Sequence, residues 1–523
     1  MMPAANRVRR RVGDILPIPA PVGGLNSRDA LADMTPNSAI VMENFFPLPS
    51  DVAIRNGWKY HCTGITGTVE SILTWAGTQA SKVFAAAGTS FYDVTSASSS
   101  PAVVQAGLDS ARWEHINFAN SAGSWLYAVN GLSAPRVYNG STWNSITTGA
   151  GAYQITGPIP TDIKTLCQHK RRIWFVPKNT MKCWYLATDA IYGAATPFDF
   201  GPIFFRGGYI VALATWTVDG GAGQDDLFAV ITSEGEVAIY QGTDPATAAT
   251  WGLQGVYYIS PPIGQRCVQK FGGDLLILTR SGVRPLSKSL QAATIDVSNN
   301  YSDKIQPTLS YEASTWGSLW GWQLVHAPEH DMIMVHVPRP QASSNVEYAM
   351  NTISYAWGMF RDLSAACFGV VGNVSYMGVT GAVGIFYSGN LDGVASDGTG
   401  GAEILAYAQT SFHYGGSRST KRASMAQPVF LASSTVSFSV AVASDYNLQT
   451  TIPTLASGGT SAVGVWGSST WGNAVWGLGV LPYQQWRSVQ SMGKCFSIQM
   501  YAKSRGVARW VTNSVVVEEG GIV

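Results

Sequence analysis

The chain has 523 residues, a net charge of +1 and only 12% charged residues, about half the share usual in soluble globular proteins. Hydrophobic residues reach 46%, with 18 Trp, 22 Tyr, 19 Phe and 56 Gly. This composition excludes intrinsic disorder, and the near-neutral charge argues against a protein that grips nucleic acid through many phosphates. The length predicts two or three domains, and so few charges suggest a surface largely covered by other subunits.

Residues 1–50 are predicted to form an extended N-terminal arm. Its tip is basic, and its Arg9, Arg10 and Arg11 are candidates for contact with a neighbouring subunit, into which a flexible arm can thread and fold. No apolar stretch follows these arginines, so the sequence predicts no signal peptide. The ILPIPAP segment comes next, and its prolines forbid helix and favour extended backbone.

A short strand, a Gly or Asn turn and a second short strand recur seven times within residues 51–395. Asn130-Gly131 in the second unit is a strong hairpin signal, because both central positions of such a turn need positive φ. The seven hairpins are predicted to start near Lys82, Ser124, Arg172, Leu227, Asp274, Met332 and Val374.

The spacing of these hairpins is close to the period of four-stranded propeller blades. A blade is one sheet whose faces are covered only by its neighbours, so such units must close into a ring. We therefore predict an all-β chain with a β-propeller of six or seven blades in residues 51–395. The alternative is two or three β-sandwiches in series.

Residues 396–523 are predicted to form a separate β-sandwich-like domain. A linker rich in Gly and Asp opens it, and two long segments then alternate apolar and polar residues. Between these segments Trp466, Trp471 and Trp476 recur every five residues, which is neither a strand nor a helix period. We interpret this stretch as a loop at a subunit contact.

The residues that could carry chemistry favour no enzyme, metal or cofactor. The segment LVHAPEHDMIMVHVP offers three histidines, but Pro328 rules out the helix that would align two of them, and strand, turn, strand is the better interpretation. Acidic pairs lie at turns, and no G-x-S-x-G or Walker A motif occurs. The six widely spaced cysteines are predicted to be buried, reduced thiols. No apolar run is long enough to predict a membrane span.

Two short basic runs remain as candidates for lining a channel or docking onto an acidic neighbour. They are Lys170, Arg171 and Arg172 at the start of a strand, and Arg418, Lys421 and Arg422 after the linker. Either run can equally be a solvated face or part of a subunit salt bridge.

The N-terminal segment contains a dense set of motifs. They are Gly23-Gly24-Leu25-Asn26, Arg28-Asp29, Ala39 leading to Glu43-Asn44-Phe45-Phe46-Pro47, and Arg55-Asn56-Gly57. This segment resembles the N-terminal region of the tail-nozzle proteins of short-tailed bacteriophages, also called tubular tail protein B or packaged-DNA stabilisation proteins. The later hairpins and the closing sandwich are similar in arrangement.

The resemblance implies a non-enzymatic virion protein without cofactors. Its subunits would form a ring, by resemblance a hexamer, that contacts the tail adaptor and fibre or needle proteins. Double-stranded DNA would pass through during ejection without being tightly held, and the protein would help to retain packaged DNA. The protein would be assembled in the bacterial cytoplasm and reside in the virion tail. The alternative function is a glycan-binding receptor of the fibre or spike kind.

Overall fold

The computed structural model describes residues 13–78, 80–217, 226–291, 300–341, 345–448, 455 and 479–519. The chain divides into two compact units. The propeller unit comprises residues 57–350 and 361–402, and the sandwich unit comprises residues 1–56, 351–360 and 403–523. Each unit is described by itself below.

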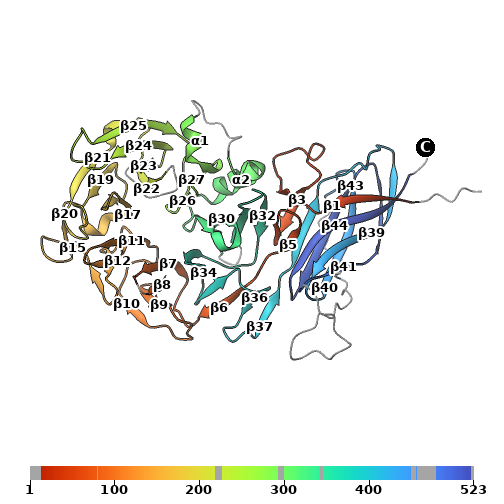
Figure 1. Cartoon of the computed structure of the whole chain (residues 1–523), viewed down its shortest axis with the longest axis horizontal. Helices are drawn as coiled ribbons and strands as arrows, with labels where there is room; N and C mark the ends of the chain where they lie inside the picture. Colours follow the sequence, from red (N-terminus) through yellow and green to blue (C-terminus); the bar gives the residue numbers. More distant parts are fainter. Residues whose placement is uncertain are drawn as a thin grey trace, which may run out of the picture. The chain divides into compact units, whose positions relative to one another are not determined.

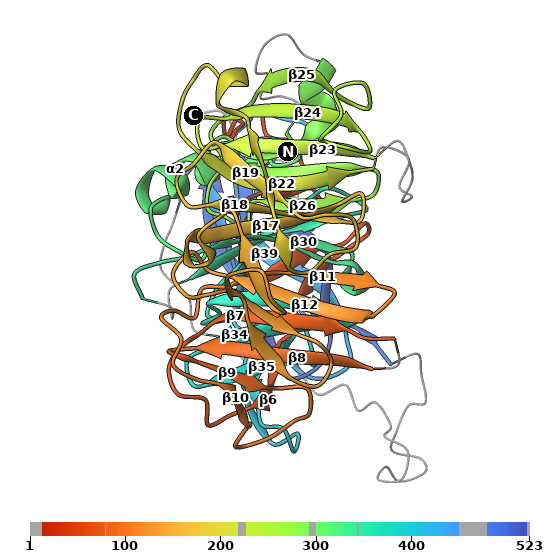
Figure 2. The ribbon, with the colours of Figure 1, turned by 90° about the vertical axis from the view of Figure 1, so that its left-hand side faces the viewer.

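The propeller unit contains, in its described residues, groups of strands that follow one another around a ring (Figure 1). Six of these groups are separate sheets, and the strands β29 to β31 belong to a larger sheet. Each group is a blade of antiparallel strands. Blades 1 to 4 have four strands each, and Figure 2 shows β22 to β25 of blade 4 running side by side. These blades are β7 (Val69–Ala76), β8 (Ser81–Ala87), β9 (Ser90–Asp93) and β10 (Val103–Gln105); β11 (Glu114–Asn120), β12 (Gly123–Val129), β13 (Arg136–Tyr138) and β14 (Trp143–Ser145); β17 (Ile163–His169), β18 (Arg172–Pro177), β19 (Lys182–Tyr185) and β21 (Thr196–Asp199); and β22 (Ile210–Trp216), β23 (Leu227–Thr232), β24 (Glu236–Gly242) and β25 (Trp251–Tyr258).

Blade 7 is completed by a strand from the other end of the propeller sequence. The strand β6 pairs antiparallel with β35, with Trp58 opposite Phe386. Hydrogen bonding the first strand to the last hairpin closes the ring without a free edge between its ends. Blades 5 to 7 are β26 (Val268–Phe271), β27 (Asp274–Thr279) and β28 (Gly282–Pro285); β29 (Gln323–Ala327), β30 (Met332–Val337) and β31 (Val346–Asn351); and β33 (Cys367–Val371), β34 (Val374–Val379), β35 (Ala382–Phe386) and β6 (Trp58–Cys62).

The seven predicted hairpins are the central strand pairs of these blades. They correspond to β8–β9, β12–β13, β18–β19, β23–β24, β27–β28, β30–β31 and β34–β35. The Gly turns are formed as expected, since Gly88, Gly131, Gly235 and Gly381 all have positive φ. The predicted β-propeller is therefore confirmed.

Remaining elements of the propeller unit connect or cover blades. The strand β36 (Leu391–Val394) pairs with β6, and β37 (Gly400–Glu403) follows it in the same sheet. A small parallel sheet contains β15 (Thr147–Thr148), β16 (Gln154–Thr156) and β20 (Gly193–Ala194). The helices are α1 (Leu286–Gln291) and α2 (Gln306–Trp316), with short 3-10 turns at Pro160–Asp162, Gly201–Ile203, Asp303–Ile305 and Pro328–His330. None of the described helices is long and apolar enough to cross a membrane.

The hydrophobic cores lie between adjacent blades. The core between blades 3 and 4 contains Trp174, Phe228, Tyr240 and Trp251, and the Trp174 and Trp251 rings stack with centroids 5.7 Å apart. Similar clusters join blades 1 and 2, blades 2 and 3, and blades 7 and 1. The abundance of aromatic residues is thus explained by blade faces that only neighbouring blades can bury.

The sandwich unit has two sheets. The first contains β4 (Phe45–Pro47), β5 (Val52–Ile54), β44 (Ala508–Glu519), β39 (Lys421–Ala432) and β41 (Leu481–Gln484), with β1 (Asp14–Pro19) on β44 and β42 (Arg487–Gly493) on β39. The second contains β32 (Trp357–Phe360), β3 (Ser38–Glu43), β38 (Ala406–Thr410), β43 (Phe496–Ser504) and β40 (Val436–Ser444), with β2 (Gly24–Leu25) on β3. Burial alternates along β39 and β40, as the period-two pattern predicts.

The unit boundaries differ from the predicted limits of 1–50, 51–395 and 396–523. From residue 13 onward the predicted arm is extended, but it contributes β1 to β5 to the sandwich. Pro17 and Pro19 lie in β1, which among the described strands pairs only with β44. An edge strand tolerates proline because one side of its backbone needs no donor. An extended segment can therefore be part of a domain core, which composition alone does not reveal.

Candidate functional site: the propeller axis

The first strand of each blade faces the propeller axis, where its backbone edge has no further strand to pair with. Side chains from a neighbouring blade take the place of that strand. The Nδ2 of Asn117 on β11 donates to the Thr74 carbonyl at 2.9 Å, and its Oδ1 accepts the Ala76 N–H at 3.0 Å. Gln323 on β29 caps Phe368 on β33 in the same way, at 2.9 and 3.1 Å. Buried backbone groups must be paired, so these amides seal the ring.

His115 on β11 belongs to this sealing set. Its Nε2 lies 3.2 Å from the backbone nitrogen of Thr74. Because an amide N–H can only donate, Nε2 is the acceptor and the proton of the neutral ring lies on Nδ1. Burial, with the positive charge of Arg266 adding to it, lowers the pKa of His115 to about 4. The ring is therefore a neutral donor at physiological pH.

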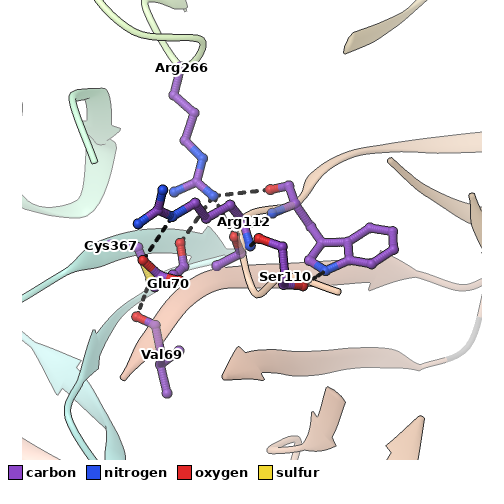
Figure 3. A network of polar contacts seen from close by, with 8 residues as sticks. Val69, Glu70, Ser110, Arg112, Arg266 and Cys367 are labelled. Atoms are coloured by element: carbon purple, nitrogen blue, oxygen red, sulfur yellow. Dashed lines mark hydrogen bonds and ion pairs between the residues drawn. The ribbon is translucent and has the colours of Figure 1, made fainter. Parts of the chain in front are cut away.

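The side chain of Arg266 extends toward Glu70 and Arg112 (Figure 3). Arg266 directly precedes β26 of blade 5, yet its Nη2 donates to the carbonyls of Glu70 at 3.2 Å and Trp113 at 3.0 Å, and to the Ser71 hydroxyl at 2.6 Å. These acceptors belong to β7 of blade 1 and to the approach to β11 of blade 2, on the opposite side of the ring. The guanidinium is thus a cross-brace between blades that are not neighbours.

Glu114 is one of the acidic residues whose charge acts on the Arg266 guanidinium. Its side chain accepts a hydrogen bond from the Thr165 hydroxyl of blade 3. Burial raises the pKa of Glu114, while that hydrogen bond and the charges of Arg266 and Lys164 act in the opposite direction. Burial also lowers the pKa of Arg266, and nearby acidic groups partly offset this.

A cavity of about 390 Å³ surrounds the brace, and we call it the axial cavity. Its lining includes Glu114, His115, Arg266, His326 and Phe368, which come from different blades. Two hollows continue it. The Trp320 mouth, of about 540 Å³, shares Gln265 with the cavity and is lined by Arg112, Lys164 and Trp320 among others.

The second hollow, the Lys170 mouth, measures about 1040 Å³ and shares Leu166 and Val268 with the axial cavity. The axis therefore offers space for a small molecule. It does not offer a passage for duplex DNA, whose major groove alone is about 12 Å wide, because Arg266 spans the ring.

The first predicted basic run lies partly at the axis. Lys170 and Arg171 line the Lys170 mouth and form the β17–β18 turn with positive φ of 47° and 58°. Arg171 is paired with Asp189 at 2.5 Å, and Arg172 with Asp244 at 3.3 Å. The two arginines are thus engaged in salt bridges within the subunit.

The second run lies in the sandwich unit, and one of its members is not a surface residue. Lys421 is only 3% exposed. Its Nζ donates to the carbonyls of Tyr414 at 3.0 Å, Ser417, Ser419 at 3.2 Å and Lys494 at 3.4 Å. The prediction that Lys421 lines a channel or docks on a partner is therefore wrong, because its charge stabilises the fold. Arg422 and Arg418 are exposed.

Other candidates fall outside the described residues or have structural surroundings. Arg9, Arg10, Arg11, Trp466, Trp471 and Trp476 lie outside the described residues. The His-rich segment is strand, turn, strand as predicted, with β29 and β30 flanking the Pro328–His330 turn. His336 is fully buried, 3.0 Å from Glu347. All six cysteines are buried and free, as expected.

The sequence did not indicate Arg266, His115 and Glu114 as candidate functional residues. Nothing local distinguishes them, since Arg266 lies in a loop-like PPIGQRCVQ stretch and the other two open an ordinary strand. Their partners are 41 or more residues away in sequence. A side chain that contacts a distant blade produces no periodic pattern in the sequence, so sequence periodicity cannot reveal it.

Comparisons with known proteins give little information beyond the sheet topology. No family model matches the chain, and no curated protein matches it. Among solved structures, the β-propeller domain of Cps50 (Swd1) from Myceliophteria thermophila overlaps at TM-score 0.39 and 10% identity, covering 63% of this chain and 99% of that one. A structure of YCF48 bound to D1 peptide overlaps at TM-score 0.27 and 10% identity, covering 63% and 95%. The propeller assignment therefore stands on the sheet topology.

Proposed function

We propose that the chain is a non-enzymatic structural subunit of a bacteriophage virion, one copy of a tail-nozzle ring through which DNA is ejected. The ring, six-fold by resemblance, would contact the tail adaptor and fibre or needle proteins and would help to retain packaged DNA. It would be assembled in the bacterial cytoplasm and reside in the virion tail. The observation that carries the proposal is the N-terminal motif block, whose residues have specific structural roles in the sandwich unit.

Gly24 and Asn26 illustrate these roles. Gly24 has φ +75°, and a Cβ there would lie 2.5 Å from the Trp357 carbonyl oxygen, so only glycine fits. The Oδ1 of Asn26 accepts the backbone N–H groups of Arg28 and Asp29, at 3.2 and 3.1 Å. Asp29 in turn pairs with Arg28 at 2.7 Å. The Gly-Gly-Leu-Asn and Arg-Asp motifs thus form one turn.

Asn44 and Arg55 join the remaining two motifs. Asn44 has φ 55°, a conformation that asparagine tolerates better than most residues. Its Oδ1 accepts from Arg55 Nε at 2.9 Å, and its Nδ2 donates to the Leu405 carbonyl at 2.9 Å. Arg55 is 1% exposed. A resemblance concentrated on residues that the fold requires is better support for kinship than one on scattered surface positions.

The low charge of the chain and the position of Arg266 at the propeller axis bear on how DNA would pass such a subunit. Net charge +1 and 12% charged residues suit a wall that DNA slides past, because each tight phosphate contact would have to be broken during transit. Since Arg266 crosses the propeller axis, the passage proposed for DNA lies between copies of the chain and not through any one propeller.

Electron microscopy of the purified full chain, alone and with neighbouring virion proteins, tests the proposal. We expect a closed ring, six-fold by resemblance, with an axial hole wide enough for duplex DNA. A chain that stays monomeric and joins no particle would refute it. Binding to host polysaccharide that is lost on Trp471→Ala would favour the alternative of a glycan-binding receptor.

A further inference from the structure

Arg266 has hydrogen-bonding capacity that its bracing role does not use. Its three hydrogen bonds all come from Nη2, and in Figure 3 the other terminal nitrogen points away from those acceptors. Neither Nε nor Nη1 makes a hydrogen bond to a described residue. Arg266 lines the axial cavity and is only partly buried, so these donors face space that a ligand can occupy.

His115 supplies a second, neutral donor in the same cavity. Since Nε2 accepts from Thr74, the Nδ1–H is the group that remains available. No described residue accepts it. Arg266 and His115 come from opposite sides of the ring and line one cavity, so a ligand there meets donors from two directions.

The Trp320 mouth adds further cations on the path inward. The guanidinium carbons of Arg112 and Arg266 lie 5.6 and 5.0 Å from the centroid of the Trp320 ring. Arg112 uses Nε to bind Glu70 at 3.0 Å, and its terminal nitrogens make no hydrogen bond to the described residues. Lys164 also lines this mouth. The face of the Trp320 ring attracts both guanidinium groups, in addition to the ion pair that Arg112 makes with Glu70.

No acidic side chain of the described residues accepts a hydrogen bond from the free nitrogens of Arg266 or from His115 Nδ1. Glu70 is engaged by Arg112, and Thr165 donates to Oε2 of Glu114, whereas Oε1 of Glu114 is buried without a partner among the described residues. Glu234 lies on the rim of the Trp320 mouth and is exposed. We propose that the junction of the Trp320 mouth and the axial cavity binds the oxyanion group, carboxylate or phosphate, of a small molecule, with Arg266, Arg112 and His115 as its donors. Guanidinium forks match such groups in geometry and charge.

This site is independent of the proposed ring function, because none of its donors is among the residues assigned to subunit contact. A molecule bound there would tie blade 5 to blades 1 and 2 more tightly than Arg266 does alone. A ligand that binds only the native state also raises the unfolding temperature, and the effect grows with the logarithm of ligand concentration above Kd.

Isothermal titration calorimetry on the full chain at constant ionic strength provides the test. The probes are inorganic phosphate, citrate and glucuronate, with glucose and chloride as controls. We expect saturable binding of at least one oxyanion and none of the controls. Comparing the affinity for phosphate with the affinities for citrate and glucuronate shows which oxyanion the site selects. Removing one charge-assisted donor weakens binding roughly ten- to hundred-fold, so Arg112→Gln and His115→Leu should each do so.

Matched variants separate binding from structure. His115→Asn keeps an acceptor for Thr74 and a donor for the ligand, so it should restore most of the affinity that His115→Leu removes. Arg171→Gln, at the opposite mouth and paired with Asp189, should leave binding unchanged. The inference is overturned if no oxyanion binds with Kd below ~10 mM, if glucose binds equally well, or if Arg112→Gln and His115→Leu leave affinity intact. Circular dichroism of each variant confirms that it is folded.

Discussion

Replacing Lys421 by methionine should destabilise the sandwich unit far more than any neighbouring surface change. The side chain is 3% exposed, and its ammonium is surrounded by four backbone carbonyls. Methionine has a similar length but donates nothing, so these carbonyls lose a charged partner. Hydrogen bonds to charged groups contribute about 1.5–3 kcal/mol each and are not additive, so we expect a loss of about 3 kcal/mol. For units of ~150–250 residues this corresponds to a Tm decrease of about 6–12 °C.

The next residue on the same strand provides the control. Arg422 is exposed and makes one hydrogen bond, from Nη2 to Gln490 at 3.0 Å. Its replacement by methionine should change stability by less than about 0.5 kcal/mol. Differential scanning calorimetry of the full chain resolves the two units if they unfold separately, and only the sandwich transition should shift for Lys421→Met. Equal effects of the two substitutions would refute the structural role assigned to Lys421.

Three further predictions concern backbone fit, ring sealing and pH. Gly24→Ala should lower the free energy of unfolding, measured by urea titration, by about 2 kcal/mol or more, because the new Cβ would lie 2.5 Å from the Trp357 backbone. Gly416 has a similar φ and open space around it, so Gly416→Ala should lower that free energy less. Gln323→Leu should lower the free energy of unfolding by about 1–3 kcal/mol, because the Phe368 backbone groups on β33 lose their side-chain partner. Amide hydrogen exchange of β33 should become faster, and unchanged exchange would contradict this prediction. Burial lowers the pKa of His169 to about 3, so the unfolded chain binds more protons below pH ~6.5 and stability should fall as pH drops toward ~4. Urea midpoints should show a flatter decline for His169→Gln, and an identical decline would exclude this role.

The hairpins and the alternation of long strands were predictable because both are local. A positive-φ glycine between two apolar runs specifies a turn, and period-two burial specifies a strand wherever it occurs. The recurrence of the hairpin then indicated a ring, since a blade cannot bury its own faces. For the same reason the prolines near residue 17 predicted extended backbone correctly, although they did not indicate that this strand would pair with β44.

The sequence by itself thus determined that this chain is a propeller joined to a sandwich and that its cysteines are buried. Only the tertiary structure decided the inclusion of residues 14–56 in the sandwich, the burial of Lys421 and the bracing of the axis by Arg266. Local backbone preferences depend on neighbouring residues. The partners of a charged side chain are instead set by ring closure, which brings Arg266 to Glu70 although the two are 196 positions apart.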